Sequence, residues 1–273
     1  MATAVATGLD AAALAAFHRD GFVVPSFRFE GAQLARLQAL SRKLVADNPH
    51  LADRPMNSPH IPGSGGQGLK STDGWLEFVT HPALLDMMEQ ILGSDLILWG
   101  TNLFYKRPET GPATAWHRDA VNNTIIKPLE TVACWVAVTD SKIENSCLRF
   151  IPGSHRKREL GNHIQVPRED LTFGTILDPA EYDEGTAVDV ELEAGQMVLF
   201  DVFSIHGARH NLGRLERTGF AMRYMPATSH YDHDATPEYH RSRPEFGHDT
   251  RPLMLVRGVD RCGRNDFRRG HPG

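Results

Sequence analysis

The pattern of the chain changes at residue 96, and this change constrains the fold most. From there on, short apolar segments rich in β-forming residues recur between turn sequences such as Ile151-Pro152-Gly153-Ser154. These segments cover residues 96–106, 131–139, 147–152, 187–192, 197–201 and 219–225. Many short strands after a helical beginning predict a mainly β fold, a sandwich or barrel with helices packed on one face.

The residues before this point predict helices. Asp10 can cap a helix over residues 11–20 that ends at Gly21, and a short strand follows at 22–24. Leucines at helical spacing predict a second helix over 31–47, and an apolar face ending at Gly93 predicts a third over 82–92. The segment 49–75 is rich in Pro, Gly, Ser and Asn and predicts a long loop.

The chain contains no internal repeat and no linker that would separate domains. Its 273 residues, 41% of them apolar, suit one large domain with its own core. We expect a helical lead-in over residues 1–95, a β core over 96–226 and a coil-rich C-terminal segment over 227–273. Residues 155–186 are expected to form a polar insertion, and the histidines at 230, 233, 240 and 248 fit no metal-ligand spacing.

Composition excludes several function classes. The formal net charge of −5 and the lack of a long basic run argue against nucleic-acid and membrane-surface partners. No apolar run reaches the roughly 20 residues of a membrane span, and the N-terminus lacks the basic start of a signal peptide. Three cysteines without C-x-x-C spacing predict neither a disulfide framework nor structural zinc. We expect a cytoplasmic protein, and its oligomeric state stays open.

The stretch Trp116-His117-Arg118-Asp119 carries the first chemical signal. One residue separates His117 from Asp119, so on an extended strand both side chains point to the same face. An imidazole and a carboxylate on one face are two of the three ligands of a 2-His-1-carboxylate iron site. Because this spacing is common by chance, the rest of the chain has to supply the third ligand.

His206 and Arg217 can complete such a site. His206 follows an apolar strand 87 residues after Asp119, and Arg217 follows 11 residues later at the start of another strand. In a double-stranded β-helix, a distant histidine can fold back beside an H-x-D pair. Three iron positions then stay open for a bidentate 2-oxo acid and O2, and an arginine can bind the far carboxylate of 2-oxoglutarate.

At this point the chain resembles the phytanoyl-CoA dioxygenase family of Fe(II)/2-oxoglutarate oxygenases. The resemblance is carried by His117-x-Asp119, Trp135, the run 145–155, His206 and Arg217, with the opening segment 17–24. It implies a double-stranded β-helix (jelly-roll, cupin-like) core. It also implies decarboxylation of 2-oxoglutarate coupled to hydroxylation of a small molecule.

The resemblance also implies residue roles. It assigns His117, Asp119 and His206 to Fe(II), and it assigns Arg217 and Trp135 to the 2-oxoglutarate pocket. Tyr105 and Lys70 match positions that often touch the cosubstrate. Ala208 departs from the family, which often has Ser or Thr there. Related halogenases carry Gly or Ala where this chain has Asp119, so hydroxylation is favoured, with desaturation or cyclisation as alternatives.

Signals for the substrate are weaker. Arg118 lies between the two ligands, and Val121 and Asn123 follow directly, so they are candidates for the mouth of the site. The remaining candidates lie on neighbouring strands: Thr101, Leu103 and, as a second inward cation or a structural ion pair, Arg223. This polar and basic rim favours a small polar acid over a long acyl-CoA.

Two other functions are compatible with parts of the pattern. A cupin-like metalloenzyme without a cosubstrate would need the three ligands but not Arg217. A non-catalytic jelly-roll binding protein would need neither. The complete triad with an arginine 11 residues after His206 favours the oxygenase.

Overall fold

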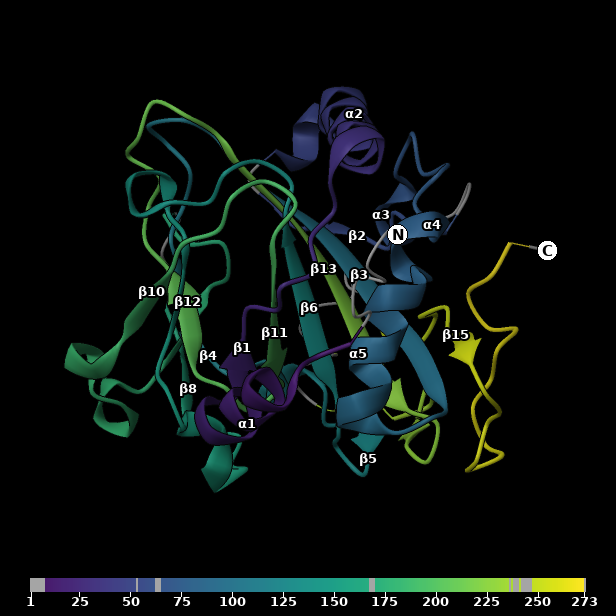
Figure 1. The fold of residues 1–273 in the computed structure, drawn as a ribbon. Helices are drawn as coiled ribbons and strands as arrows, with labels where there is room; N and C mark the ends of the chain where they lie inside the picture. The colour runs from purple at the N-terminus through teal and green to yellow at the C-terminus, as the bar shows by residue number, and fades with distance from the viewer. Residues whose placement is uncertain are drawn as a thin grey trace, which may run out of the picture.

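The computed structural model describes residues 8–52, 54–61, 65–166, 170–235, 237, 241 and 247–272. These residues form mainly β structure with helices concentrated at the beginning of the chain (Figure 1). The α-helices are α1 (Ala11–Asp20), α2 (Gly31–Asp47), α3 (Gly65–Gly68), α4 (Leu76–Val79) and α5 (Pro82–Leu92). Short 3-10 turns are η1 (Pro49–Leu51), η2 (Asp119–Asn122), η3 (Ile143–Asn145), η4 (Ser154–Lys157), η5 (Pro179–Glu181) and η6 (Glu184–Thr186). None of the described helices has the length and apolar character to span a bilayer.

The three predicted helices are confirmed with the expected bounds. The Asp10 side chain accepts a hydrogen bond from the Ala13 amide at 2.7 Å, which caps α1. Gly21 ends α1 in the left-handed region, at φ +86°, where a side chain would be strained. Pro82 begins α5, where its missing N–H costs no helical hydrogen bond. The predicted loop 49–75 contains short elements as well, among them η1, α3 and β2.

The described strands form one large antiparallel sheet and one smaller one. The large sheet has the order β1-β11-β6-β13-β3-β15, with β2 paired to β3 beside this path. Its strands are β1 (Phe22–Val23), β11 (Met197–Asp201), β6 (Val132–Ala137), β13 (Arg217–Pro226), β3 (Leu96–Lys106), β15 (Met254–Arg257) and β2 (Met56–Asn57). Each of the predicted strands in this set lies within two residues of its expected bounds.

The smaller sheet has the order β10-β7-β12-β4. Its strands are β10 (Val188–Val190), β7 (Leu148–Phe150), β12 (His206–Ala208) and β4 (Thr114–His117). Two further pairs, β14 (His230–Tyr231) with β5 (Ile126–Lys127) and β8 (His163–Gln165) with β9 (Thr175–Leu177), lie in or beside segments expected to be coil. These strands have only two or three residues and lie in polar segments, so the sequence did not predict them.

Alternation along β6 separates two layers of core. Cys134 and Val136 pack with α2, α5 and the other helices on one face of the large sheet. Ala133, Trp135 and Ala137 pack on the other face against Leu148 and Phe150 of the smaller sheet. This division follows from the period of two in a strand. Figure 1 shows α5 on one side of the large sheet, with β10, β12 and β4 on its opposite side.

A buried histidine lies in the helix-side layer. His60 has no exposed surface, and its Nδ1 lies 2.7 Å from the Thr101 hydroxyl of β3. Burial, together with the nearby Arg251 and His271, lowers the pKa of His60 from 6.5 to about 3. As the pH falls, His60 therefore takes up a proton at a higher pH in the unfolded chain than in the folded protein.

We predict that this histidine contributes to acid sensitivity. Its contribution to stability is fully present above pH 6.5 and is lost as the pH falls toward about 3, because the folded pKa is the lower one. The slope is at most about 1.4 kcal/mol per pH unit. Urea unfolding of His60→Gln should show a shallower decline below pH 6.5 than the unmodified protein. The exposed-residue control His50→Gln should keep the original slope.

Candidate active site

Strand pairing brings the two candidate histidines together. His117 ends β4 and lies directly opposite His206 of β12, and the two ring centroids are 4.2 Å apart. Arg118 keeps an extended backbone, so Asp119, the first residue of η2, turns to the same side as His117. One ligand atom from each of His117, Asp119 and His206 lies within 4.8 Å of the others, and all three side chains are buried.

Backbone carbonyls fix how the two imidazoles are protonated. His117 Nδ1 lies 2.8 Å from the Ala115 carbonyl oxygen, and His206 Nδ1 lies 3.0 Å from that of Ser204. Since a carbonyl oxygen only accepts, each Nδ1 donates a proton and each Nε2 presents a lone pair. His117 Nε2 faces Asp119 Oδ1 at 3.3 Å, so two acceptors meet in a buried place. This donor set fits a divalent metal cation between them.

Nearby charges and burial keep Asp119 ionised and His206 neutral, as metal binding requires. Burial alone would raise the pKa of Asp119, but Arg223, His117 and His206 outweigh it and hold that pKa well below its usual range. The Arg223 Nε lies 3.3 Å from Asp119 Oδ2, and its Nη1 donates to the Asn102 side-chain oxygen. Burial lowers the pKa of His206 to about 3, so this imidazole is neutral at pH 7.

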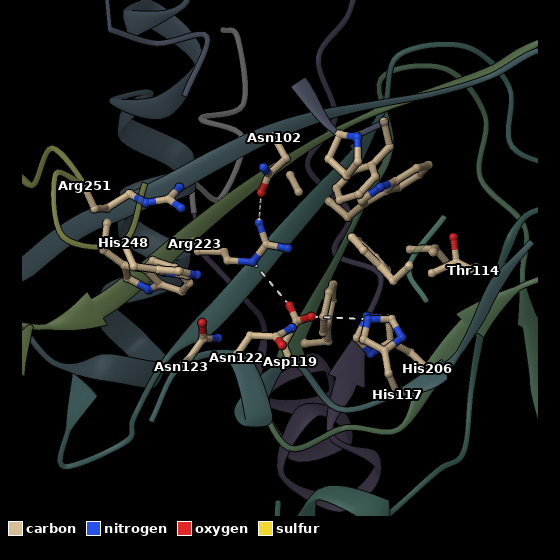
Figure 2. A pocket seen from close by; sticks show the side chains of 18 of the residues that line it. Asn102, Thr114, His117, Asp119, Asn122, Asn123, His206, Arg223, His248 and Arg251 are labelled. Carbon is tan, nitrogen blue, oxygen red and sulfur yellow. Dashed lines mark hydrogen bonds and ion pairs between the residues drawn. The ribbon is translucent and has the colours of Figure 1, made fainter. Parts of the chain in front are cut away.

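The triad opens into a cavity between the two sheets. Trp135, Phe200, Leu148 and Phe104 form apolar parts of its wall. Its polar lining comes from both sheets and from loops: Asn102, Thr114, Asn122, Asn123, Arg217, Arg223, His248 and Arg251. Figure 2 shows Arg223 between Asn102 and Asp119, while Thr114 lies on the other side of the histidines.

Arg217 lines this cavity as a buried cation. It is 2% exposed, and burial lowers its pKa to about 10. Its Nε donates to the Ser146 carbonyl at 3.0 Å, and its guanidinium carbon lies 5.1 Å from the Trp135 ring centre. Among the residues that the structure describes, no acid lies within ion-pair distance of Arg217. The charge of Arg217 therefore lines the cavity without a carboxylate from the described residues to compensate it.

Lys106 is a second buried basic residue beside Arg217, and the sequence reasoning missed it. The two residues are paired across β3 and β13. The Lys106 ammonium donates to the Ser146 hydroxyl at 3.0 Å and to the Arg209 carbonyl at 2.8 Å. Burial first, and then Arg217, hold the pKa of Lys106 well below its usual range. The pairing of β3 with β13 would have revealed it.

Comparison with known proteins identifies the family. A sequence model of phytanoyl-CoA dioxygenase (PhyH) matches residues 17–219. The chain belongs to the phytanoyl-CoA dioxygenase family. It is 26% identical over 165 residues to the phytanoyl-CoA dioxygenase domain-containing protein 1 homolog of Caenorhabditis elegans. That match covers 59% of this chain and 57% of the worm protein, so it spans little more than half of that relative.

Longer matches come from other members and from solved structures. An ectoine dioxygenase of Bordetella bronchiseptica is 24% identical, with 94% of this chain and 89% of that protein covered. The apo structure of the non-heme monooxygenase ThoJ is 27% identical, with a TM-score of 0.70 and coverage of 92% and 85%. EctD from S. alaskensis with 2-oxoglutarate and 5-hydroxyectoine shares the fold at 23% identity, a TM-score of 0.65 and coverage of 84% and 79%.

Three residues that the sequence predicted near the site do not line the main cavity. Thr101 bonds to His60, and Leu103 belongs to the core under the helices. Tyr105 borders a hollow beside α2 and a small one at the strand end, but not the main cavity. Asn102 and Phe104 occupy the cavity face of β3, so these three side chains do not line the main cavity.

The structure also places the Arg118 side chain away from the mouth of the site, where the sequence predicted it. It is 1% exposed, and its Nη1 donates to Glu181 Oε2 at 2.9 Å, on the side of the strand opposite the ligands. It therefore braces the segment around η5 and does not form a rim. Val121 is half-buried outside the cavity lining, whereas Asn123 lines the cavity. Lys70 is exposed, and its backbone exchanges hydrogen bonds with Asn48 at the end of α2, away from the cavity.

The C-terminal segment contributes lining residues that sequence reasoning missed. Arg251 and His248 reach the cavity from a stretch without periodicity, so no pattern signalled them. Within the described part of the chain, the triad is the cluster whose ligand atoms could share a metal. His233 bonds instead to the Arg251 carbonyl through Nε2, at 2.8 Å. His240 lies outside the described residues.

We predict that His117→Ala lowers the affinity for a divalent metal by about 100-fold or more, because a whole ligand is lost, whereas the loss of an outer hydrogen bond costs about 10–100-fold. Calorimetric titration with Co(II) measures this directly. His18→Ala, at an exposed position on α1, is the control and should bind Co(II) as the unmodified protein does. Unchanged binding by His117→Ala would refute the assignment.

We also predict that Gly219 is required for the position of Trp135. A Cβ added to Gly219 would lie 1.8 Å from Cζ2 of the Trp135 indole, so a side chain there displaces the ring. Gly219→Val should lower the free energy of unfolding by about 1–3 kcal/mol. Denaturant unfolding tests this, with Gly185→Ala on an exposed 3-10 turn as the control.

Proposed function

We propose that this protein is an Fe(II)/2-oxoglutarate-dependent dioxygenase that hydroxylates a small polar molecule. The observation that carries the proposal is a buried His-Asp-His triad in the same cavity as Arg217, whose charge no described acid neutralises. Membership of the phytanoyl-CoA dioxygenase family supports it. The two sheets that face each other across the cavity would be the double-stranded β-helix, within one oxygenase domain over residues 1–273.

His117, Asp119 and His206 would hold the metal through two Nε2 atoms and a carboxylate oxygen. Bound there, Fe(II) would supply the activation of O2 that is coupled to the decarboxylation of 2-oxoglutarate to succinate and CO2. The protein contributes orientation, since the Ala115 and Ser204 carbonyls hold the two rings with their lone pairs toward the triad. The surrounding apolar side chains exclude bulk water from this place.

Arg217 would bind the distal carboxylate of 2-oxoglutarate with its planar fork. Its Nε is already held by Ser146, and Trp135 covers one face of the guanidinium. Ala208 and Ala221 are small, which leaves room beside these groups for the cosubstrate, while the missing side chain of Gly219 makes room for the Trp135 ring. Lys106 lies next to Arg217 and is a further hydrogen-bond donor on this side of the site, where the family often has a hydroxyl at position 208.

Asp119 favours hydroxylation over halogenation, because its carboxylate takes the position that a halide would need. Desaturation and ring closure remain the alternative outcomes, since they depend on where the substrate carbon lies. Asn102 and Asn123 on the cavity wall suit a small polar substrate better than a long acyl chain. Mass analysis of the product separates the outcomes, because hydroxylation adds one oxygen atom.

The direct test is succinate formation from 2-oxoglutarate by the protein with Fe(II), O2 and ascorbate. We expect succinate in the complete mixture and none without Fe(II). Turnover that needs the metal but no 2-oxoglutarate would support the cupin-like alternative. No metal-dependent binding or turnover at all would favour the non-catalytic binding protein.

The cosubstrate role of Arg217 has its own test. Removing one partner of a buried charge pair costs about 2–5 kcal/mol, so Arg217→Gln should raise the dissociation constant for 2-oxoglutarate at least about 30-fold. Calorimetric titration of 2-oxoglutarate measures the change. Arg257→Gln is the matched control, because Arg257 pairs with Asp86 and Glu89 on the helix side. Equal affinities in the two variants would contradict the assignment.

A further inference from the structure

The opening segment 17–24 has no part in the function proposed above, although it helps to carry the family resemblance. It joins the two sheets. Its strand β1 pairs with β11 of the large sheet (Figure 1). The Asp20 carbonyl just before β1 accepts a hydrogen bond at 2.8 Å from the amide of Gly153, in the turn after β7 of the smaller sheet. The further contacts of this segment lead to the metal-ligand candidate His206.

The turn between β11 and His206 is tied to Gly21. The Gly21 carbonyl oxygen accepts two hydrogen bonds, one from the Asp201 amide and one from the Ser204 hydroxyl, both at 2.9 Å. Ser204 has no exposed surface, so loss of this bond would leave a buried donor without its partner. A Cβ on Gly21 would lie 2.6 Å from Ser204 Oγ, at a backbone φ of +86°. The glycine therefore allows one carbonyl to hold both ends of the turn.

The backbone carbonyl of Ser204 sets the direction of the His206 imidazole. His206 Nδ1 donates to this carbonyl at 3.0 Å, which leaves Nε2 as the atom for a metal. A partner of this kind fixes both the tautomer and the orientation of a metal-ligating histidine. Because the hydroxyl and the carbonyl belong to one residue, the bond from Ser204 to Gly21 also holds the group that orients the ring.

Aromatic rings make a second connection between the opening segment and His206. Phe22 stacks on Phe150, with ring centres 4.6 Å apart and 20° between the planes. Phe150 stacks in turn on the His206 imidazole, at 5.6 Å and 18°. Phe200, the partner of Phe22 in the pairing of β1 with β11, packs on the same imidazole at 4.7 Å. Two phenylalanine rings thus contact the imidazole, and Phe22 supports one of them.

We propose that Ser204 and Phe22 are positioning residues for His206, through which the opening segment sets the metal affinity of the triad. Neither of them is among the residues that line the cavity. Ser204 acts through its carbonyl on Nδ1, and Phe22 acts through Phe150 on the face of the ring. Together the two contacts restrict the rotation and the tilt of the imidazole, so that Nε2 keeps its direction. The proposal rests on the function proposed above, because it takes His206 as a metal ligand.

Titration of the full-length, metal-free protein with Co(II), followed by calorimetry, tests the role of Ser204. Loss of the whole partner of a metal-ligating histidine costs about 10–100-fold in affinity. Since Ser204→Ala keeps the carbonyl and loses only the bond that holds it, we expect a loss of about three- to tenfold. Ser41→Ala is the matched control and should bind Co(II) as the unmodified protein does. Ser41 is also buried and its hydroxyl also donates to a backbone carbonyl, that of Leu37 at 2.8 Å, but on α2.

Phe22→Leu tests the second connection, and it decides the matter if Ser204→Ala fails to fold. It keeps an apolar side chain but removes the stacked ring, so the affinity for Co(II) should fall at least about twofold. Phe27→Leu is its control, because the partly buried Phe27 ring packs against His81 on the helix side. The visible absorption bands of bound Co(II) depend on ligand geometry. They should change in the two test variants and stay the same in the two controls, and thermal unfolding checks that each variant is folded.

The outcomes separate this proposal from the function on which it rests. Unchanged affinity and absorption in folded Ser204→Ala and Phe22→Leu, or an equal loss in the controls, would overturn the positioning role. A protein that forms succinate while both test variants bind Co(II) normally is an oxygenase whose opening segment only supports the fold. The expected losses without succinate would establish the positioning role at a metal site with other chemistry. If the unmodified protein does not bind Co(II), the triad is no metal site and both proposals fail.

Discussion

The ion pair between Asp119 and Arg223 is the interaction on which the site depends. A carboxylate buried between two sheets costs several kcal/mol unless a cation compensates it nearby. Asp119 follows β4 of the smaller sheet, and Arg223 comes from β13 in the large one, so the pair joins the two walls of the cavity. It keeps the carboxylate ionised and fixes its direction. The two histidines, whose orientation is fixed by backbone carbonyls, complete the donor set.

Local signals in the sequence predict much of the fold. Asp10, Gly21, Pro82 and Gly93 set the helix ends because capping and left-handed turns depend on a few adjacent residues. The period of two predicts which residues of β6 face the helices and which face the smaller sheet. The same period puts His117 and Asp119 on one side, and the structure brings His206 to them. In each case the rule involves neighbours in the chain or the alternation of one strand.

Residues whose position depends on distant partners could not be predicted. The face of β3 is fixed by its pairing with β13, which places Phe104 opposite Gly219 and therefore on the cavity side. Without that register, Tyr105 is an equally good candidate. Arg118 is buried because Glu181, 63 residues later, accepts its hydrogen bond. Arg251 reaches the cavity from a segment without periodicity. Such positions follow from tertiary packing, which no local propensity encodes.

The pairing of His206 with His117 has a consequence for how the protein can change in evolution. His206 is located by its partners His117 and Phe150 on adjacent strands, and not by the 86 residues that lie between it and Asp119. Much of that interval, including β8 and β9, lies outside the two strands that carry the histidines. Because doubling a loop costs only about 0.6 kcal/mol, insertions there can reshape the cavity entrance without moving the triad. The residues of the triad can therefore stay the same in evolution while the residues that select the substrate change.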